Sequence, residues 1–431
     1  KRMNKIFKVI WSKSKQCYIV VSEIAKNKTG KKKIVVASIL VALAMQSGMI
    51  ADVMAADPPS AKLADAALAV GTNGVAIGSS AKSQSNQSVA IGYFSNAQAP
   101  SASPENPATA VGAGANANGA GTVALGLSAN ATGANAVALG GGSNGGTNKT
   151  EATAANATAV GFNAKASNSG ASAIGTNAKA TGENSVAVGS GAGNSGPLGF
   201  ASSINSSGSV VNTLKTINYA TTAEGNNAVA LGFYANAKNS GVAVGQNALA
   251  ATGGVAIGKG VFEDTNNNLA GGVVIGQDSA STGIYSLAMG RHAFATGSTS
   301  MAMGYEASAN GNFAVAMGRN VTATETSTAI GHHATASNGG LAIGSQENDA
   351  SNDKTTASAK GAVAIGKNST ASSEDAVAIG TNAQSDKKGA VALGSGSTTA
   401  TLATNNTSAT INGITYNFAG ATGNPNMQVS V

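Results

Sequence analysis

The chain has 431 residues, a length that would ordinarily give two or three globular domains. Aromatic residues make up only 4% and charged residues only 10% of it, so the large side chains from which compact cores are built are scarce. The formal charge of +7 is unevenly distributed, because the first 56 residues hold 11 of the 26 Lys and Arg but two of the 19 Asp and Glu, a net +9, and leave −2 for the rest. The remainder is close to neutral and gives no electrostatic footprint for DNA or RNA, so nucleic acid is not expected as a partner.

The N-terminal segment has the order of a secretory signal peptide. A long cationic stretch from Met3 leads into the apolar run "IVVASILVALAMQSGMI", and small residues follow. This order predicts an extended signal peptide over residues 1–56, cleaved near Ala55 or Ala56. A membrane anchor is the alternative, but the apolar run closes early and small residues flank its end.

The exported body is predicted to contain no thiol. Trp11 and Cys17 are the only Trp and Cys of the chain, and both lie in the leader. Disulfides, cysteine-metal sites and cysteine nucleophiles are therefore excluded from the body.

An apolar tetrad that ends in glycine recurs through residues 57–400, most often every 14 residues. A period this short cannot hold a pair of helices, which needs more than about 30 residues, so each unit is predicted to be one coil of a β-solenoid. The glycines that end the tetrads are Gly78, Gly92, Gly112, Gly126, Gly140, Gly161, Gly175, Gly189, Gly232, Gly245, Gly258, Gly276, Gly290, Gly304, Gly318, Gly331, Gly344, Gly366, Gly380 and Gly394.

One strand of each coil is expected to face water on one side. In the segment "NAKA", Ala178 and Ala180 fall on one face and Lys179 on the other, because strand side chains alternate. The outward position is polar in most other coils, as at Lys82, Asn130, Lys165, Asn236, Ser308, Thr322, Thr335, Thr370 and Gln384.

The other strand, formed by the tetrad, has no polar face. In "VAVG", Val186 and Val188 point one way and Ala187 the other, so both sides must be covered. The coil's own interior covers one side. The other side needs a partner, so the pattern predicts an oligomer whose subunits press these strands together, with alanine permitting close approach. Glycines such as Gly182 are expected at tight corners, where φ is positive or backbones pack closely.

The "NSVAVG" repeat preceded by "NAKATG" resembles the YadA-like head of trimeric autotransporter adhesins. The leader "MNKIFKVIW…VVSEIAK" is similar to their extended signal peptide, and "INGITYNFAG…VSV" at Ile411–Val431 resembles the segment before their neck. The resemblance implies a left-handed parallel β-roll, assembled as a homotrimer and exported to the surface of a bacterium with an outer membrane.

The chain departs from the full family pattern in its last part. Residues 401–431 are expected to lead towards a neck, and the chain is expected to end before a stalk and a membrane anchor. Sustained heptads and a series of amphipathic strands are not found. The outer membrane is therefore expected to be reached only through a C-terminal anchor that this chain lacks.

Catalytic, cofactor and metal sites are not predicted. "GAGNSG" gives a G-x-G-x-x-G at Gly191, Gly193 and Gly196, but Pro197 and a Ser/Gly-rich stretch follow where a dinucleotide site needs a helix. A loop is the expected structure, and cofactors are not expected.

The histidines and acidic residues are expected in surface turns. His292, His332 and His333 follow repeat glycines, and carboxylates at a ligand-like spacing are missing beside His332. Glu374 and Asp375 also lie in a turn and form no evident catalytic pair, and the calcium-binding "GGxGxD" repeat is absent.

Two inserts interrupt the repeat, near 190–227 and 345–361. Inserts in repeat proteins map to loops on one face, which often binds ligands; a degenerate coil is the alternative for both. About twenty coils at about 4.8 Å each make a rod on the order of 100 Å long, and three chains would present each surface feature three times.

The sequence thus predicts a non-enzymatic surface adhesin that attaches to host matrix or cell-surface ligands, with autoaggregation as a further activity. A passive coat or spacer is the alternative. A left-handed solenoid enzyme is more remote, because neither a hexapeptide period nor a histidine base in a subunit cleft is evident.

A candidate ligand-contact stripe breaks the polar pattern of the water-facing strand, at the position equivalent to Lys179. In four successive coils the outward position is Leu249, Phe262, Ala280 and Phe294. Equivalent positions stack in a solenoid, so these residues predict an exposed apolar stripe of about 14 Å. The alternatives are that the insert "EDTNNNLAGG" folds over them or that the register slips there.

Overall fold

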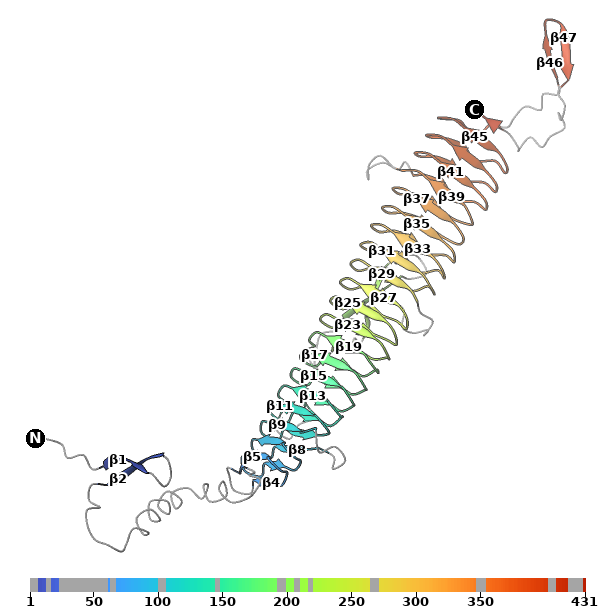
Figure 1. Cartoon of the computed structure of the whole chain (residues 1–431). Coiled ribbons are helices and arrows are strands. Elements are labelled where there is room, and N and C mark those ends of the chain that lie inside the picture. Colours follow the sequence, from blue (N-terminus) through green and yellow to red (C-terminus); the bar gives the residue numbers. More distant parts are fainter. Residues whose placement is uncertain are drawn as a thin grey trace, which may run out of the picture.

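The chain folds into a parallel β-solenoid that forms a long rod (Figure 1). The described residues form strands and turns and no helix, and none of them belongs to a helical segment fit to cross a membrane. The predicted all-β solenoid of about 14-residue coils is confirmed. A computed structural model of the protein describes residues 7–12, 17–22, 61–62, 67–99, 106–143, 148–191, 199–204, 210–215, 220–263, 271–345, 354–401, 408–417 and 429–431.

Each coil contributes one strand to each of two parallel sheets. The tetrad sheet, built from the apolar tetrads, contains β3 (Ala61–Lys62), β5 (Val75–Ile77), β7 (Val89–Ile91), β9 (Thr109–Val111), β11 (Val123–Leu125), β13 (Val137–Leu139), β15 (Thr158–Val160), β17 (Ser172–Ile174), β19 (Val186–Val188), β23 (Val229–Leu231), β25 (Val242–Val244), β27 (Val255–Ile257), β29 (Val273–Ile275), β31 (Leu287–Met289), β33 (Met301–Met303), β35 (Val315–Met317), β37 (Thr328–Ile330), β39 (Leu341–Ile343), β41 (Val363–Ile365), β43 (Val377–Ile379), β45 (Val391–Leu393) and β48 (Val429–Ser430). The second sheet contains β4 (Leu68–Ala69), β6 (Lys82–Ser83), β8 (Asn96–Gln98), β10 (Asn116–Asn118), β12 (Asn130–Ala131), β14 (Glu151–Ala152), β16 (Lys165–Ala166), β18 (Lys179–Ala180), β22 (Thr222–Ala223), β24 (Asn236–Ala237), β26 (Leu249–Ala250), β28 (Phe262–Glu263), β30 (Ala280–Ser281), β32 (Phe294–Ala295), β34 (Ser308–Ala309), β36 (Thr322–Ala323), β38 (Thr335–Ala336), β40 (Thr356–Ala357), β42 (Thr370–Ala371) and β44 (Gln384–Ser385).

Small side chains fill the space between the two sheets. Ala178 and Ala180 from the second sheet and Ala187 from the tetrad sheet are fully buried. Ser185 is also buried, and its hydroxyl donates a 2.7 Å hydrogen bond to the carbonyl oxygen of Gly182. A buried methyl group contributes only about 0.8 kcal/mol, so a coil lined by alanines is stable only when its neighbours stack on it.

Glycine closes the corners for two different reasons. Gly304, at the end of its tetrad, has φ +129°, and a Cβ there would overlap the carbonyl oxygen of Gly318 in the next coil. Gly182, at the opposite corner, needs no positive φ, but a Cβ would overlap the backbone of Gly225. Both expectations for corner glycines, positive φ and close backbone packing, are confirmed.

The second sheet faces water only over part of its length. Lys179 is exposed at the outward position, as predicted. Thr222 and Asn236 occupy the same position in the next two coils but are only 4% and 6% exposed. The prediction of a water-facing position is therefore wrong at Asn236, whose side-chain amide donates a 3.3 Å hydrogen bond to Glu224 Oε1 of the preceding coil.

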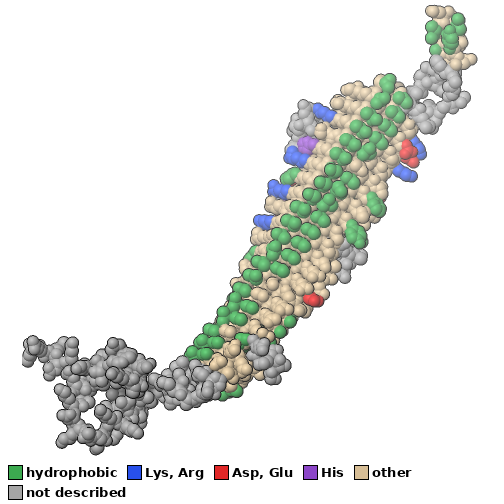
Figure 2. Space-filling model, in the orientation of Figure 1, with side chains coloured by type: hydrophobic (Ala, Val, Ile, Leu, Met, Phe, Trp, Pro, Cys, Tyr) green, Lys and Arg blue, Asp and Glu red, His purple; other side chains and the backbone are tan. Residues whose placement is uncertain are grey.

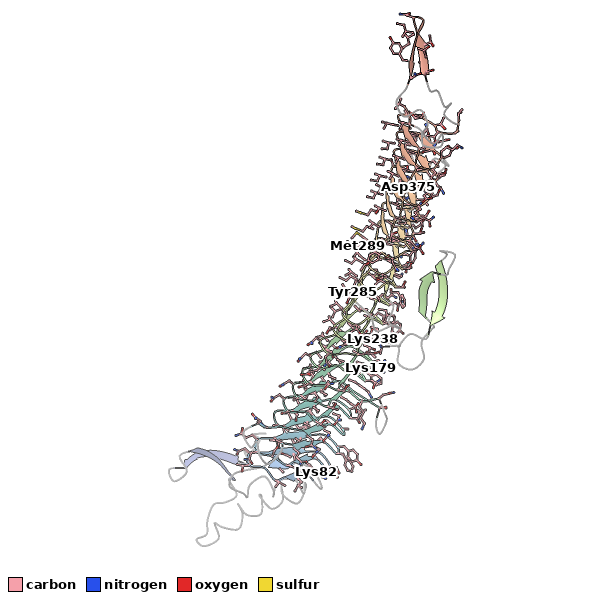
Figure 3. All side chains as sticks on the ribbon, turned by 90° about the vertical axis from the view of Figure 1, so that its right-hand side faces the viewer. Lys82, Lys179, Lys238, Tyr285, Met289 and Asp375 are labelled. Atoms are coloured by element: carbon pink, nitrogen blue, oxygen red, sulfur yellow. The ribbon has the colours of Figure 1, made fainter. Side chains whose placement is uncertain are left out.

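Among the described residues, three antiparallel hairpins lie outside the coils in sequence: β1 (Phe7–Ser12) with β2 (Cys17–Ser22) in the leader, β20 (Gly199–Ile204) with β21 (Val210–Lys215), and β46 (Ser408–Ile411) with β47 (Ile414–Asn417). The hairpin β20–β21 belongs to the first insert and stands at the side of the rod (Figure 3). Stacking continues across this insert, since Lys179 pairs with Thr222. Residues 346–353 of the second insert lie outside the described residues.

Candidate functional site

The outward face of the tetrad sheet is an apolar surface that one protomer leaves uncovered. In most strands the middle residue is buried, as Ala187 is, and the residues on either side are half-buried or exposed, as Val186 and Val188 are. Figure 2 shows the resulting rows of hydrophobic side chains along the length of the rod. We call this surface the apolar face. Alanine therefore points into the coil, and the larger residues point towards a potential partner.

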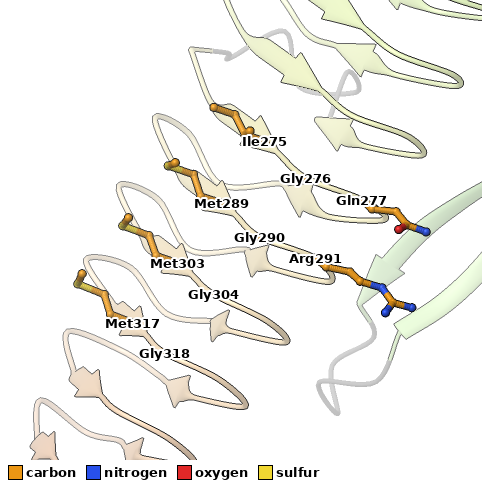
Figure 4. Close-up of a pocket in the computed structure, with 10 residues that line it drawn as sticks. All are labelled: Ile275, Gly276, Gln277, Met289, Gly290, Arg291, Met303, Gly304, Met317 and Gly318. Atoms are coloured by element: carbon orange, nitrogen blue, oxygen red, sulfur yellow. The ribbon is translucent and has the colours of Figure 1, made fainter.

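Methionines replace the valines and isoleucines in one part of the apolar face. Met289, Met303 and Met317 follow Ile275 in successive coils and line an open groove of about 720 Å³ (Figure 4). Thioether side chains are flexible and polarizable, so they adapt to the shape of whatever packs on them. This part of the face therefore offers the most adaptable contact surface along the described coils.

Charged and aromatic side chains stack in a row at the corner beside this groove. The guanidinium carbons of Arg291 and Arg319 each lie 5.7 Å from the ring centroid of Tyr305, which is in the coil between them. A side-chain hydrogen bond with Glu306 is the main cause that raises the pKa of the Tyr305 phenol, and the two arginines oppose it. Figure 2 shows Lys and Arg side chains along this edge of the rod. The row holds its charges in a line next to the apolar face.

Comparison with known families agrees with this geometry. The profile described as extended signal peptide of type V secretion system matches residues 3–50. The profile described as YadA head domain repeat matches nine segments, and the two profiles together cover more than half of the chain. The segments matched by the head repeat are 69–95, 107–129, 117–143, 152–177, 166–192, 219–235, 295–320, 357–383 and 371–397.

The chain belongs to the trimeric autotransporter adhesins with a YadA-like head. The leader and the head identify an exported protein that is displayed on the cell surface in its full-length form. No protein among the curated sequences compared matches this adhesin.

The histidines of the adhesin head occupy the turns where they were expected. His292 and His333 have φ +56° and +58°, and His292 Nε2 lies 3.8 Å from Asp278 Oδ2 of the preceding coil. The described ranges contain no group of three or more His, Cys, Asp or Glu side chains able to hold a metal ion. Of the G-x-G-x-x-G motif only Gly191 is described.

The acidic turn of the adhesin head that contains Glu374 forms an ion pair between coils. Lys388 Nζ donates a 2.7 Å hydrogen bond to Glu374 Oε2, which lowers the pKa of the carboxyl and raises that of the ammonium. Both groups are exposed, so the pair adds little to stability. Asp375 beside it has φ +56° and shapes the turn.

The candidate ligand-contact stripe of the adhesin head stacks as predicted but is not one exposed surface. Leu249 pairs with Phe262, Phe262 with Ala280, and Ala280 with Phe294, so the register does not slip. Ala280 and Phe294 are only 1% and 7% exposed, whereas Leu249 and Phe262 are half-buried. The expectation of exposure is therefore wrong for Ala280 and Phe294. A role of the stripe in binding stays a prediction.

Burial gives Phe294 a structural role in the adhesin head. Changing Phe294→Thr is expected to lower the free energy of unfolding by about 2–3 kcal/mol, since a covered ring is lost. Thr322→Ala, at the half-buried outward position two coils later, is the control and is expected to change it by less than about 0.5 kcal/mol. Thermal and urea unfolding followed by circular dichroism measure both. An equally small effect at Phe294 would contradict its burial.

Sequence reasoning missed the methionine groove and the arginine–tyrosine row. The signal for the groove was present in the successive tetrads "LAMG", "MAMG" and "VAMG", which end at Gly290, Gly304 and Gly318. The row of Arg291, Tyr305 and Arg319 was harder to predict from the sequence, because its members are 14 residues apart and become neighbours only when the coils stack.

Proposed function

We propose that three copies of the chain assemble through their apolar faces. The observation that carries this proposal is the outward orientation of the larger residues of the tetrad sheet. Ile174 and Leu393 are 41% and 46% exposed in one protomer, although they belong to a continuous apolar surface. Contiguous apolar surface of this length usually marks an interface, and a second and third copy provide a matching one.

We infer that the assembled head attaches the cell to host matrix or cell-surface ligands, and also to other cells of its kind. The head acts by binding and not by catalysis. A rod on the order of 100 Å long projects its surface away from the cell, and three chains present each contact three times. Several individually weak contacts then combine, through multivalency, to give firm attachment.

Binding of the purified exported chain to immobilised matrix proteins and to glycans tests this function. We expect saturable binding, and we expect the soluble chain to compete with attachment of cells that display it. Binding that does not saturate on any surface, together with attachment unaffected by the competitor, would instead favour a passive coat.

A further inference from the structure

One corner of the coils carries an unusual run of residues in the left-handed backbone region. Four successive coils place Tyr285, Thr299, Phe313 and Thr326 there, with φ between +51° and +60°. Bulky and β-branched side chains rarely adopt this conformation. In the other coils the same position is mostly Asn, Asp or Gly, as at Asn73, Gly121, Asn135, Asn156, Gly170, Asn184, Asn227, Gly253, Gly339, Gly361, Asp375 and Gly389.

The four residues stack directly one above another. The backbone N–H of Thr299 donates to the carbonyl oxygen of Ile284 at 2.7 Å, and that of Phe313 donates to Ser298 at 2.9 Å. Each coil advances by about 4.8 Å, so the rings of Tyr285 and Phe313 are about 10 Å apart with a threonine between them. We call these four residues the aromatic ridge.

The strain of the aromatic ridge is not repaid by burial. Tyr285 is 68% exposed and Phe313 is 63% exposed in the protomer. The Tyr285 ring lies against Gly271, where a Cβ would come within 2.9 Å of it, and Figure 3 labels its position on the rod. Asparagine would adopt the same backbone conformation at lower cost, as Asn227 does at the equivalent position of another coil. Strain kept without a packing gain points to a role in binding.

The chemistry of the aromatic ridge suits an uncharged ligand with flat apolar faces and many hydroxyls. The Thr299 and Thr326 hydroxyls donate to the carbonyl oxygens of Ser298 and Glu325, each at 2.7 Å, so their lone pairs remain available to accept hydrogen bonds. Glu325 is the only charged residue in the four turns at 282–285, 296–299, 310–313 and 324–326. A sulfated or carboxylated polymer would find no cation here.

We propose that the aromatic ridge binds an extended, uncharged, β-linked polysaccharide by stacking of sugar rings on Tyr285 and Phe313. In such a chain every second sugar presents the same face, and the length of a disaccharide repeat matches the spacing of the two rings. The threonine between them accepts hydrogen bonds from the intervening sugar. The proposal rests on the proposed function, because it names one ligand class for the adhesin head.

Titration of the purified exported chain with oligomers of β-1,4-linked N-acetylglucosamine tests the proposal. We expect the tetrasaccharide to bind at least about tenfold more tightly than the monosaccharide, because only a chain of three or more sugars reaches both rings. The double variant Tyr285→Asn, Phe313→Asn is expected to lose at least about tenfold in affinity for the tetrasaccharide. Its melting temperature is expected to stay the same or rise, because the strain is relieved.

Phe94→Asn is the matched control, since Phe94 is also left-handed, with φ +54°, and 55% exposed but lies at the other corner. It is expected to leave tetrasaccharide binding unchanged. Undiminished binding by the double variant would overturn the proposal, and so would a lower melting temperature or a smaller mass of that variant. Binding of a Pro-rich peptide in place of the sugar would also overturn it. Cell attachment, measured separately, decides the adhesin function independently of this ligand.

Discussion

Replacing Gly304 by alanine is expected to destabilise the coils around it by at least about 3 kcal/mol. The glycine has φ +129°, a conformation that alanine adopts only with strain. The added Cβ would also overlap the carbonyl oxygen of Gly318, which belongs to backbone and cannot move without shifting the next coil. Because every coil supports its neighbours, the strain should spread along the solenoid. Thermal unfolding followed by circular dichroism and limited proteolysis measure the effect.

Gly253→Ala separates the overlap from backbone conformation. Gly253 has φ +69°, but a Cβ there would meet nothing within 4 Å. The Gly253→Ala variant is therefore expected to lose about 1 kcal/mol of its free energy of unfolding, the ordinary cost of placing alanine in the left-handed region. If the two variants melt alike, the close stacking of coil backbones at the tetrad glycines does not limit stability.

The inward and outward positions of each strand were predictable because alternation and a fixed period determine them. Ala178 and Lys179 take their expected sides, and the pairing of Lys179 with Thr222 keeps this register across an insert. Alternation likewise made it predictable that both faces of the tetrad strand are apolar and need to be covered. The two faces differ because most coils place alanine in the thin interior and a larger apolar residue on the outside, although Val274 shows that the interior also accepts a valine.

The cover over part of the second sheet was not predictable from the repeat. Asn236 and Phe294 sit at positions that are outward by period, and yet both are buried, since the period fixes the side that a residue takes and not what contacts it there. The aromatic ridge had a readable signal, the replacement of Asn, Asp or Gly by Tyr285 and Phe313. Its meaning required the backbone angles, since exposure and strain together distinguish a binding residue from an ordinary turn residue.

Changing Met303→Asp is expected to abolish the proposed trimer. Met303 is half-buried in one protomer and points out of the tetrad sheet between Met289 and Met317. In an assembly through the apolar faces, three carboxylates would be removed from water close to one another, with a cost of several kcal/mol each. The free protomer exposes the same position, so the substitution should act on association more than on the coil itself. Light scattering should give about three chains for the unchanged protein and less than that, or non-specific aggregates, for the variant.

Thr322→Asp is the matched control for this change. Thr322 is equally half-buried but lies on the outward side of the second sheet, where Thr335 of the next coil is its neighbour. The carboxylate can remain hydrated there, so the mass in solution is expected to stay at about three chains. Met303→Leu keeps the apolar volume and is expected to preserve the mass as well. A Met303→Asp protein that remains trimeric with unchanged melting would show that the apolar face is not where the protomers meet.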